Sequence, residues 1–110
     1  GDASEGMLVT LPKAFDEDPK NAHLVEAFKA KKQDPRGAFV FPAYAAVQVM
    51  ADAMTLSKSD DPDTVAKTLR SNSFDTPTGV LEFDDKGDLK NFSFVVYQWH
   101  ADGSKTALTE

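Results

Sequence analysis

Apolar residues along this chain fall into short runs whose spacing alternates between that of strands and that of helices. A short apolar run at residues 7–11 has the length of a strand, and Pro12 is expected to end it. Apolar positions then recur at helical spacing between residues 22 and 28. Asp18 is the candidate N-cap of that helix, and Pro19 its first residue. The first third of the chain is therefore predicted to form a strand and then a helix.

The next predicted helix is apolar on nearly every side. Pro42 is placed as its first residue, because the N–H that proline lacks has no partner at that position. Residues 43–56 are mostly apolar, and a helix of this kind is buried on more than one side. The segment Phe39–Phe41 is expected to be extended, because proline disfavours helical geometry in the residue before it.

A candidate N-cap aspartate followed by proline, as at Asp18-Pro19, occurs again at Asp61-Pro62. It predicts a helix that runs to about Asn72. Residues 74–78 are predicted to be irregular.

Two strands are predicted near the C-terminus, at residues 79–83 and 92–99, with a charged turn at 84–88 between them. The second strand carries apolar residues on both faces, as a strand covered on both sides does. A turn at Asp102-Gly103 is expected to lead into a polar tail. The resulting order of strands and helices, β–α–β–α–α–β–β, predicts the α/β fold class.

Composition narrows the classes of function. A formal charge of −6 over 110 residues argues against nucleic acid or an anionic membrane surface as a partner, since both need clustered Lys and Arg. The one basic cluster, at residues 29–32, is flanked by Glu26 and Asp34 and is interpreted as a solvated helix end. The absence of cysteine excludes disulfides, thiolate catalysis and Cys-based zinc sites.

The start of the chain carries no signal-peptide pattern. Either a signal has been removed, or these residues come from the interior of a longer protein.

No catalytic or metal-binding constellation is recognisable. His23 and His100 each lack a carboxylate at ligand spacing, and no G-x-S-x-G elbow occurs. The acidic turn at residues 84–88 lacks the alternating acidic spacing of a calcium loop. The sequence therefore predicts neither an enzyme nor a cofactor.

One aromatic cluster has the chemistry of a ligand site. Phe39, Phe41 and Tyr44 surround Pro42 at a predicted helix N-terminus, where free N–H groups carry partial positive charge. Such an end beside an aromatic wall suits a small ligand with a carboxylate and an apolar tail. The alternative is that the three aromatics are core residues at the junction of a strand and a helix.

Three segments together resemble a known family. They are EGMLVTLP at residues 5–12, the region at 29–48 that contains KAKKQDP, GAFV and YAAVQ, and the region at 85–103 that contains DKGDLK and QWHADG. They resemble the C-terminal part of the periplasmic leucine/isoleucine/valine-binding proteins. Those are the soluble substrate-binding components of ABC-type amino-acid importers.

The resemblance implies the type I periplasmic-binding-protein fold, in which two α/β lobes are joined by crossing segments and helices pack on a mainly parallel sheet. Residues 1–12 would form a strand of the C-terminal lobe and a hinge crossing. Residues 13–88 would be the last part of the N-terminal lobe. Residues 89–110 would be a second crossing and the final strand of the C-terminal lobe.

The resemblance also implies a function, which is to bind a branched-chain or related small amino acid in the cleft between the lobes, by hinge closure, in the periplasm. Phe39 matches the family's aromatic that contacts the ligand side chain, whereas Phe41 and Tyr44 are interpreted as core. The implied partners are the remaining N-terminal part of the same protein and an ABC permease, with no nucleic acid and no cofactor. The alternatives are a ligand-sensing module of a receptor or regulator, and a segment of an engineered binding-protein sensor.

Overall fold

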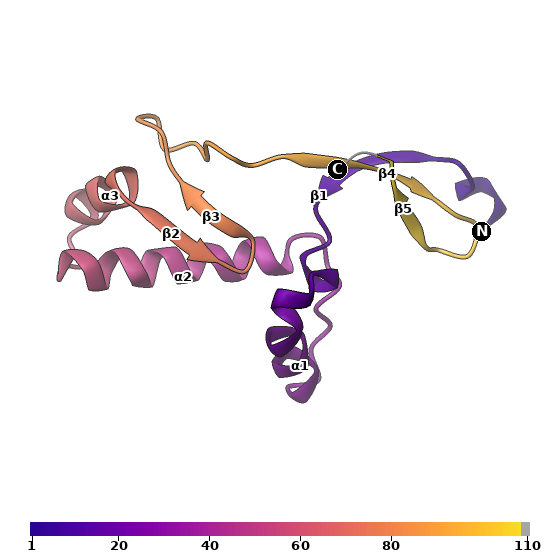
Figure 1. The fold of residues 1–110 in the computed structure, drawn as a ribbon, viewed down its shortest axis with the longest axis horizontal. Coiled ribbons are helices and arrows are strands. Elements are labelled where there is room, and N and C mark those ends of the chain that lie inside the picture. The colour runs from indigo at the N-terminus through magenta and orange to yellow at the C-terminus, as the bar shows by residue number, and fades with distance from the viewer. Residues whose placement is uncertain (109–110) are drawn as a thin grey trace. The chain divides into compact units, whose positions relative to one another are not determined.

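The structure is a computed structural model that describes residues 1–108, and these residues divide into two compact units (Figure 1). One unit contains Gly1–Lys13 and the chain from Ser93 onward, and the other contains Ala14–Phe92. The chain therefore passes from one unit to the other twice, after Lys13 and after Phe92.

The first unit is a three-stranded antiparallel sheet in the order β1-β4-β5. Its elements are the short 3-10 turn η1 (Asp2–Ser4) and the strands β1 (Leu8–Pro12), β4 (Phe94–Trp99) and β5 (Lys105–Ala107). Strand β1 pairs with β4 from Leu8 opposite Gln98 to Pro12 opposite Phe94, so the predicted strand at 7–11 is confirmed and includes the proline.

Within residues 1–108, strand β4 is more completely covered on one face than on the other. Val95 and Tyr97 are buried, whereas Phe94 on the opposite face is 59% exposed. The predicted cover on both faces is thus not provided by the described part of the chain.

Strand β5 occupies what was predicted to be a polar tail. The turn before it forms as predicted: Gly103 has a φ of 85°, and the Asp102 carboxylate accepts a hydrogen bond from the Ser104 N–H over 2.8 Å. This turn reverses the chain, so Lys105–Ala107 pairs with β4. The prediction of a tail was wrong because three polar or small residues carry no strand signal of their own.

The second unit contains the three α-helices and a hairpin. Its elements are two 3-10 turns, η2 (Phe15–Glu17) and η3 (Pro19–Asn21), the helices α1 (Ala22–Ala30), α2 (Val40–Ser57) and α3 (Pro62–Ser71), and the strands β2 (Ser73–Thr76) and β3 (Gly79–Glu82).

Both predicted caps form. The Asp61 carboxylate accepts the Thr64 N–H over 2.9 Å at the start of α3, and the Asp18 carboxylate accepts the Lys20 N–H over 3.1 Å. Asp18 and Pro19 begin the 3-10 turn η3, however, and α1 itself starts only at Ala22.

Helix α2 starts two residues earlier than predicted, so the prediction of an extended Phe39–Phe41 was wrong. Pro42 is the third residue of the helix. Its missing N–H is harmless there, because the first four N–H groups of any helix have no intrahelical acceptor. The penalty for a helical residue before proline is outweighed by the burial of Phe41, which is only 2% exposed.

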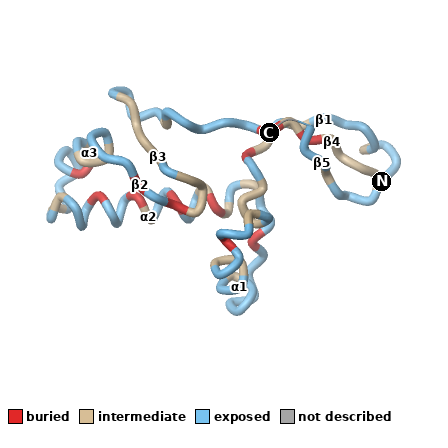
Figure 2. The backbone as a smooth tube through the Cα atoms, in the orientation of Figure 1, coloured by how far each residue is buried: buried red, intermediate tan, exposed pale blue. Residues whose placement is uncertain are grey.

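The core of the second unit follows one line along α2. Phe41, Ala45, Val49 and Ala53 are buried at intervals of four residues, which places them on one face of the helix. Figure 2 shows this row as separated red bands on α2. Val49 and Ala53 form a cluster with Val65 of α3 and Phe74 of β2.

Residues 73–76 form a strand, not the irregular segment that was predicted. Pro77 and Thr78 alone connect β2 to β3, and the Thr76 hydroxyl donates to the Gly79 carbonyl over 2.8 Å and so closes the turn.

The strand pairs of residues 1–108 are all antiparallel, so these residues show none of the mainly parallel sheet that was expected. For β2-β3 and β4-β5 the reason is local, since short connections such as Pro77-Thr78 can join only antiparallel neighbours.

Candidate ligand-binding surface at the start of helix α2

The loop between α1 and α2 is held by local contacts that place the start of α2. Lys32 adopts a left-handed conformation with a φ of 57°, and the Gln33 N–H returns to the Phe28 carbonyl over 3.0 Å, which ends α1. Asp34 then accepts hydrogen bonds from the Arg36 backbone N–H, over 3.0 Å, and from its guanidinium, over 2.9 and 2.7 Å. This guanidinium lowers the pKa of Asp34 to about 2.

Phe39 lies at the N-cap position of α2, with its side chain 64% exposed. Its backbone carbonyl accepts the Ala43 N–H over 2.9 Å, and the Gly37 carbonyl accepts the Val40 N–H over 3.0 Å. The first turn of α2 is therefore fixed by the backbone, while the aromatic ring at its start is open to contact.

The other two aromatics of the predicted cluster lie in different environments. Phe41 is buried, with its ring centroid 6.0 Å from that of Phe28, so its interpretation as core is confirmed. Tyr44 has an edge contact with the same Phe28 ring at 6.3 Å but is 43% exposed, so the interpretation as core was wrong for Tyr44. Phe28 thus joins α1 to the first two turns of α2.

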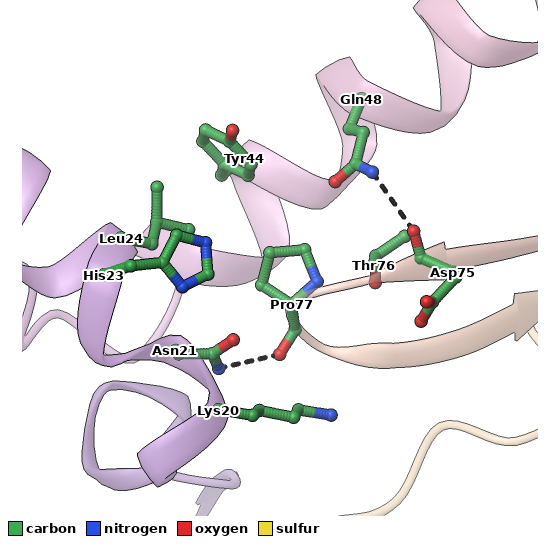
Figure 3. A pocket seen from close by; sticks show the side chains of 9 residues that line it. All are labelled: Lys20, Asn21, His23, Leu24, Tyr44, Gln48, Asp75, Thr76 and Pro77. Carbon is green, nitrogen blue, oxygen red and sulfur yellow. Dashed lines mark hydrogen bonds between the residues drawn. The ribbon is translucent and has the colours of Figure 1, made fainter.

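Tyr44 lines an open, mostly polar hollow of about 350 Å³ between η3, α1, α2 and β2 (Figure 3). Two side chains tie its walls together. Asn21 donates from Nδ2 to the carbonyls of Phe15 and Pro77, each over 2.9 Å, and Gln48 donates from Nε2 to the Asp75 carbonyl over 3.1 Å.

The lining of this hollow carries both signs of charge as well as hydrogen-bonding groups. The lining residues are Lys20, Asn21, His23, Leu24, Tyr44, Gln48, Asp75, Thr76 and Pro77. Sequence reasoning missed the role of Asn21, which is only 2% exposed, because an Asn in a polar helix start has the pattern of a surface residue.

A second hollow, of about 280 Å³, has an almost wholly apolar lining along the opposite side of α2. It is formed by Pro42, Ala45, Ala46, Val49, Met50, Leu69, Thr78, Leu81, Phe83, Leu89 and Phe92. Phe39 lines neither of these two hollows.

The two histidines are not brought together with further ligands. His23 lies on the wall of the polar hollow. His100 lies in the other unit, where its Nδ1 is 3.2 Å from Glu5 Oε1 and its Nε2 is 2.8 Å from the Thr106 hydroxyl. Within residues 1–108, no group of three or more His, Asp or Glu side chains is placed to hold a metal ion. In the same range, no helix combines the length and the apolar character needed to cross a membrane.

Among known protein families, the family model described as "Periplasmic binding protein" matches residues 1–104, which is nearly the whole chain. The chain belongs to the periplasmic binding protein family. This confirms the resemblance and, with it, the type I fold class expected from it.

Several similar proteins are named for amino-acid binding. The chain is 61% identical over 106 residues to the leucine-, isoleucine-, valine-, threonine- and alanine-binding protein of Pseudomonas aeruginosa, a match that covers 96% of this chain and 28% of that protein. It is 57% identical to the leucine-specific-binding protein of Salmonella typhimurium, covering 96% of this chain and 29% of the relative. The chain thus spans less than a third of the length of these relatives.

Solved structures give the same family. A leucine binding protein from Thermotoga maritima superposes with a TM-score of 0.79 at 27% identity, covering 99% of this chain and 31% of that one. A solute binding protein of an ABC transporter from R. palustris, solved with benzoate, superposes at 0.74 with 19% identity over 98% of this chain and 30% of its own, which supports the fold alone.

Proposed function

We propose that this chain is the C-terminal portion of the substrate-binding component of an ABC-type amino-acid importer. In this proposal the complete protein works in the periplasm, binds a branched-chain or related small amino acid and delivers it to a membrane permease. The observation that carries the proposal is the 61% identity, over 96% of the chain, to a relative named for binding leucine, isoleucine, valine, threonine and alanine.

The proposal assigns the two units to different lobes. Residues 1–12 and 89–110 would belong to the C-terminal lobe and the crossings that lead to it, and residues 13–88 to the N-terminal lobe. The division of the chain after Lys13 and after Phe92 supports this assignment, since both points lie within a few residues of the proposed boundaries.

Binding would operate by closure of the two lobes on the ligand. A closed form that contacts the amino acid from both sides is stabilised by ligand, because the open form makes fewer of these contacts. Phe39 would supply one aromatic wall for the apolar side chain of the ligand. Its exposed ring at the fixed first turn of α2 supports this role.

The test is the affinity of the complete protein for leucine, isoleucine and valine, measured by isothermal titration calorimetry with Phe39→Ala beside the unsubstituted protein. We expect Phe39→Ala to weaken binding by roughly 1–3 kcal/mol through lost apolar contact. Phe94→Ala is the matched control, because Phe94 is of the same residue type and similarly exposed but lies in the other unit.

Two results would contradict different parts of the proposal. Unchanged affinity of Phe39→Ala would remove Phe39 from the site. A complete protein that binds none of the amino acids named for its relatives would overturn the function itself.

A further inference from the structure

We propose that Gly37 is a positioning residue for Phe39, because only a residue without a side chain leaves room for the Val40 side chain, which packs against position 37 in the turn that carries Phe39. The inference rests on the proposed function in one respect, namely that the Phe39 ring faces the ligand. It identifies a residue that sets the geometry of the ligand surface without touching the ligand.

The requirement for glycine at position 37 is one of space. A Cβ added to Gly37 would lie 2.9 Å from Cγ2 of Val40, which is closer than carbon atoms of real side chains approach. The backbone of Gly37 is not among those with positive φ, so an L-residue meets no conformational penalty there. The methyl group of alanine would therefore act through Val40 alone.

Val40 has little freedom to move its Cγ2 away. As a β-branched residue it has a restricted χ1. Its N–H is also fixed, since it donates to the Gly37 carbonyl over 3.0 Å. An added methyl at position 37 is thus expected to displace the backbone of Val40 and not only its side chain.

A displacement of Val40 reaches Phe39 directly, because Phe39 is the preceding residue and the N-cap of the same helix. Contacts outside the turn oppose its movement as a block. On one side the Gln33 N–H donates to the Phe28 carbonyl of α1 over 3.0 Å, and Pro35 is buried. On the other side the Phe41 ring is buried against Phe28. The strain is therefore expected to fall on the segment that carries the Phe39 ring.

The experiment places 4-fluorophenylalanine at position 39 of the complete protein and records its ¹⁹F resonance without ligand. We expect Gly37→Ala to shift or broaden this resonance. In the Val40→Ala background, which lacks the Cγ2 atom, the same Gly37→Ala substitution is expected to leave the resonance where Val40→Ala alone puts it. A fluorine label at position 94, in the other unit, is the control and should not respond.

Affinity for leucine supplies the second measurement. Gly37→Ala is expected to weaken binding by roughly three- to thirtyfold, which lies within the roughly two- to 150-fold range of coupling between residues in contact. In the Phe39→Ala background it should add no further loss, because the ring it positions is gone. Circular dichroism and the thermal midpoint check that each variant is folded.

The outcomes separate the two proposals. An unmoved fluorine resonance in Gly37→Ala, or a shift that persists in the Val40→Ala background, overturns the positioning role whether or not an amino acid binds. A shift of the resonance in Gly37→Ala that disappears in the Val40→Ala background supports the positioning role. Normal leucine binding by Phe39→Ala would contradict only the contact between Phe39 and the ligand and would leave that support intact.

Discussion

Asp34 and Arg36 form a small, fully local ion pair in the loop that leads to the candidate site. The guanidinium, at 2.7 and 2.9 Å, and the Arg36 N–H together hold the pKa of Asp34 at about 2, below its ordinary 3.8. A carboxyl whose pKa is lowered by folding stabilises the folded form above its unfolded pKa, and this contribution is lost as the pH falls through the folded value. The pair therefore makes its full contribution to the order of the loop above about pH 4 and loses that contribution as the pH falls from about 4 to 2, and the contribution is small because both side chains are exposed.

Replacing Arg36 by Gln should raise the pKa of Asp34 towards 3.8, because the side-chain hydrogen bonds from the guanidinium are the largest cause of the lowered value and only the smaller contribution of the backbone N–H would remain. NMR titration of the side-chain carboxyl resonances in the complete protein measures this directly. Asp61 is an internal control, since its pKa is lowered by Thr64 and not by a charge, and should not change. A pKa of Asp34 that stays at about 2 in Arg36→Gln would show that the ion pair does not set it.

At the scale of elements, the caps were predictable and the strands were less so. The start of α3 was predicted correctly, because the cap that Asp61 forms and the helical position that Pro62 occupies depend only on residues 61–64. Strand β2 contains a single buried aromatic, Phe74, and forms because the Thr76 hydroxyl closes the following turn. That contact depends on the fold of the hairpin, which no short apolar pattern encodes.

The candidate site shows the same division. The spacing of aromatic residues beside a proline does not predict which of them are exposed. The sequence alone therefore could not assign Phe39, Phe41 and Tyr44 to a ligand site or to the core. The resemblance to a family selected Phe39. The structure separated the buried Phe41 from the half-exposed Tyr44, and this depends on Phe28, which lies thirteen or more residues earlier in the chain.

The pairing of α2 with β2 and α3 rests on Phe74, which is 5% exposed within the cluster of Val49, Ala53 and Val65. Phe74→Ala in the complete protein is expected to lower the free energy of unfolding by about 3–5 kcal/mol, through lost burial and the cavity left behind. Urea denaturation measures the loss. Ser73→Ala, at the exposed neighbouring position, should stay within about 0.5 kcal/mol, and a similar small effect from Phe74→Ala would contradict the assignment of this core.

At the scale of the whole molecule, the chain leaves much of its apolar surface uncovered. Within residues 1–108, α2 buries one row of side chains, while Val47 is 72% and Leu56 is 57% exposed. Met50 and Met54 are also exposed, at 44% and 39%. Helix α2 is thus apolar on faces that residues 1–108 do not cover. Burial on more than one side, as predicted, would need packing partners from outside these residues.

The 110 residues expressed by themselves are therefore expected to bind the dye ANS strongly and to unfold on heating without a sharp cooperative transition. Exposed apolar surface and two units with small separate cores both favour this result. The complete protein, about three times longer in the relatives, is the reference and should bind little dye and unfold cooperatively. Fluorescence titration and differential scanning calorimetry measure both quantities. The contrary result would be a monomeric 110-residue chain with a sharp calorimetric transition and no dye binding. In that case the apolar side chains of α2 would need no packing partner from the rest of the protein, and the assignment of this chain as part of a larger lobe would lose its physical basis.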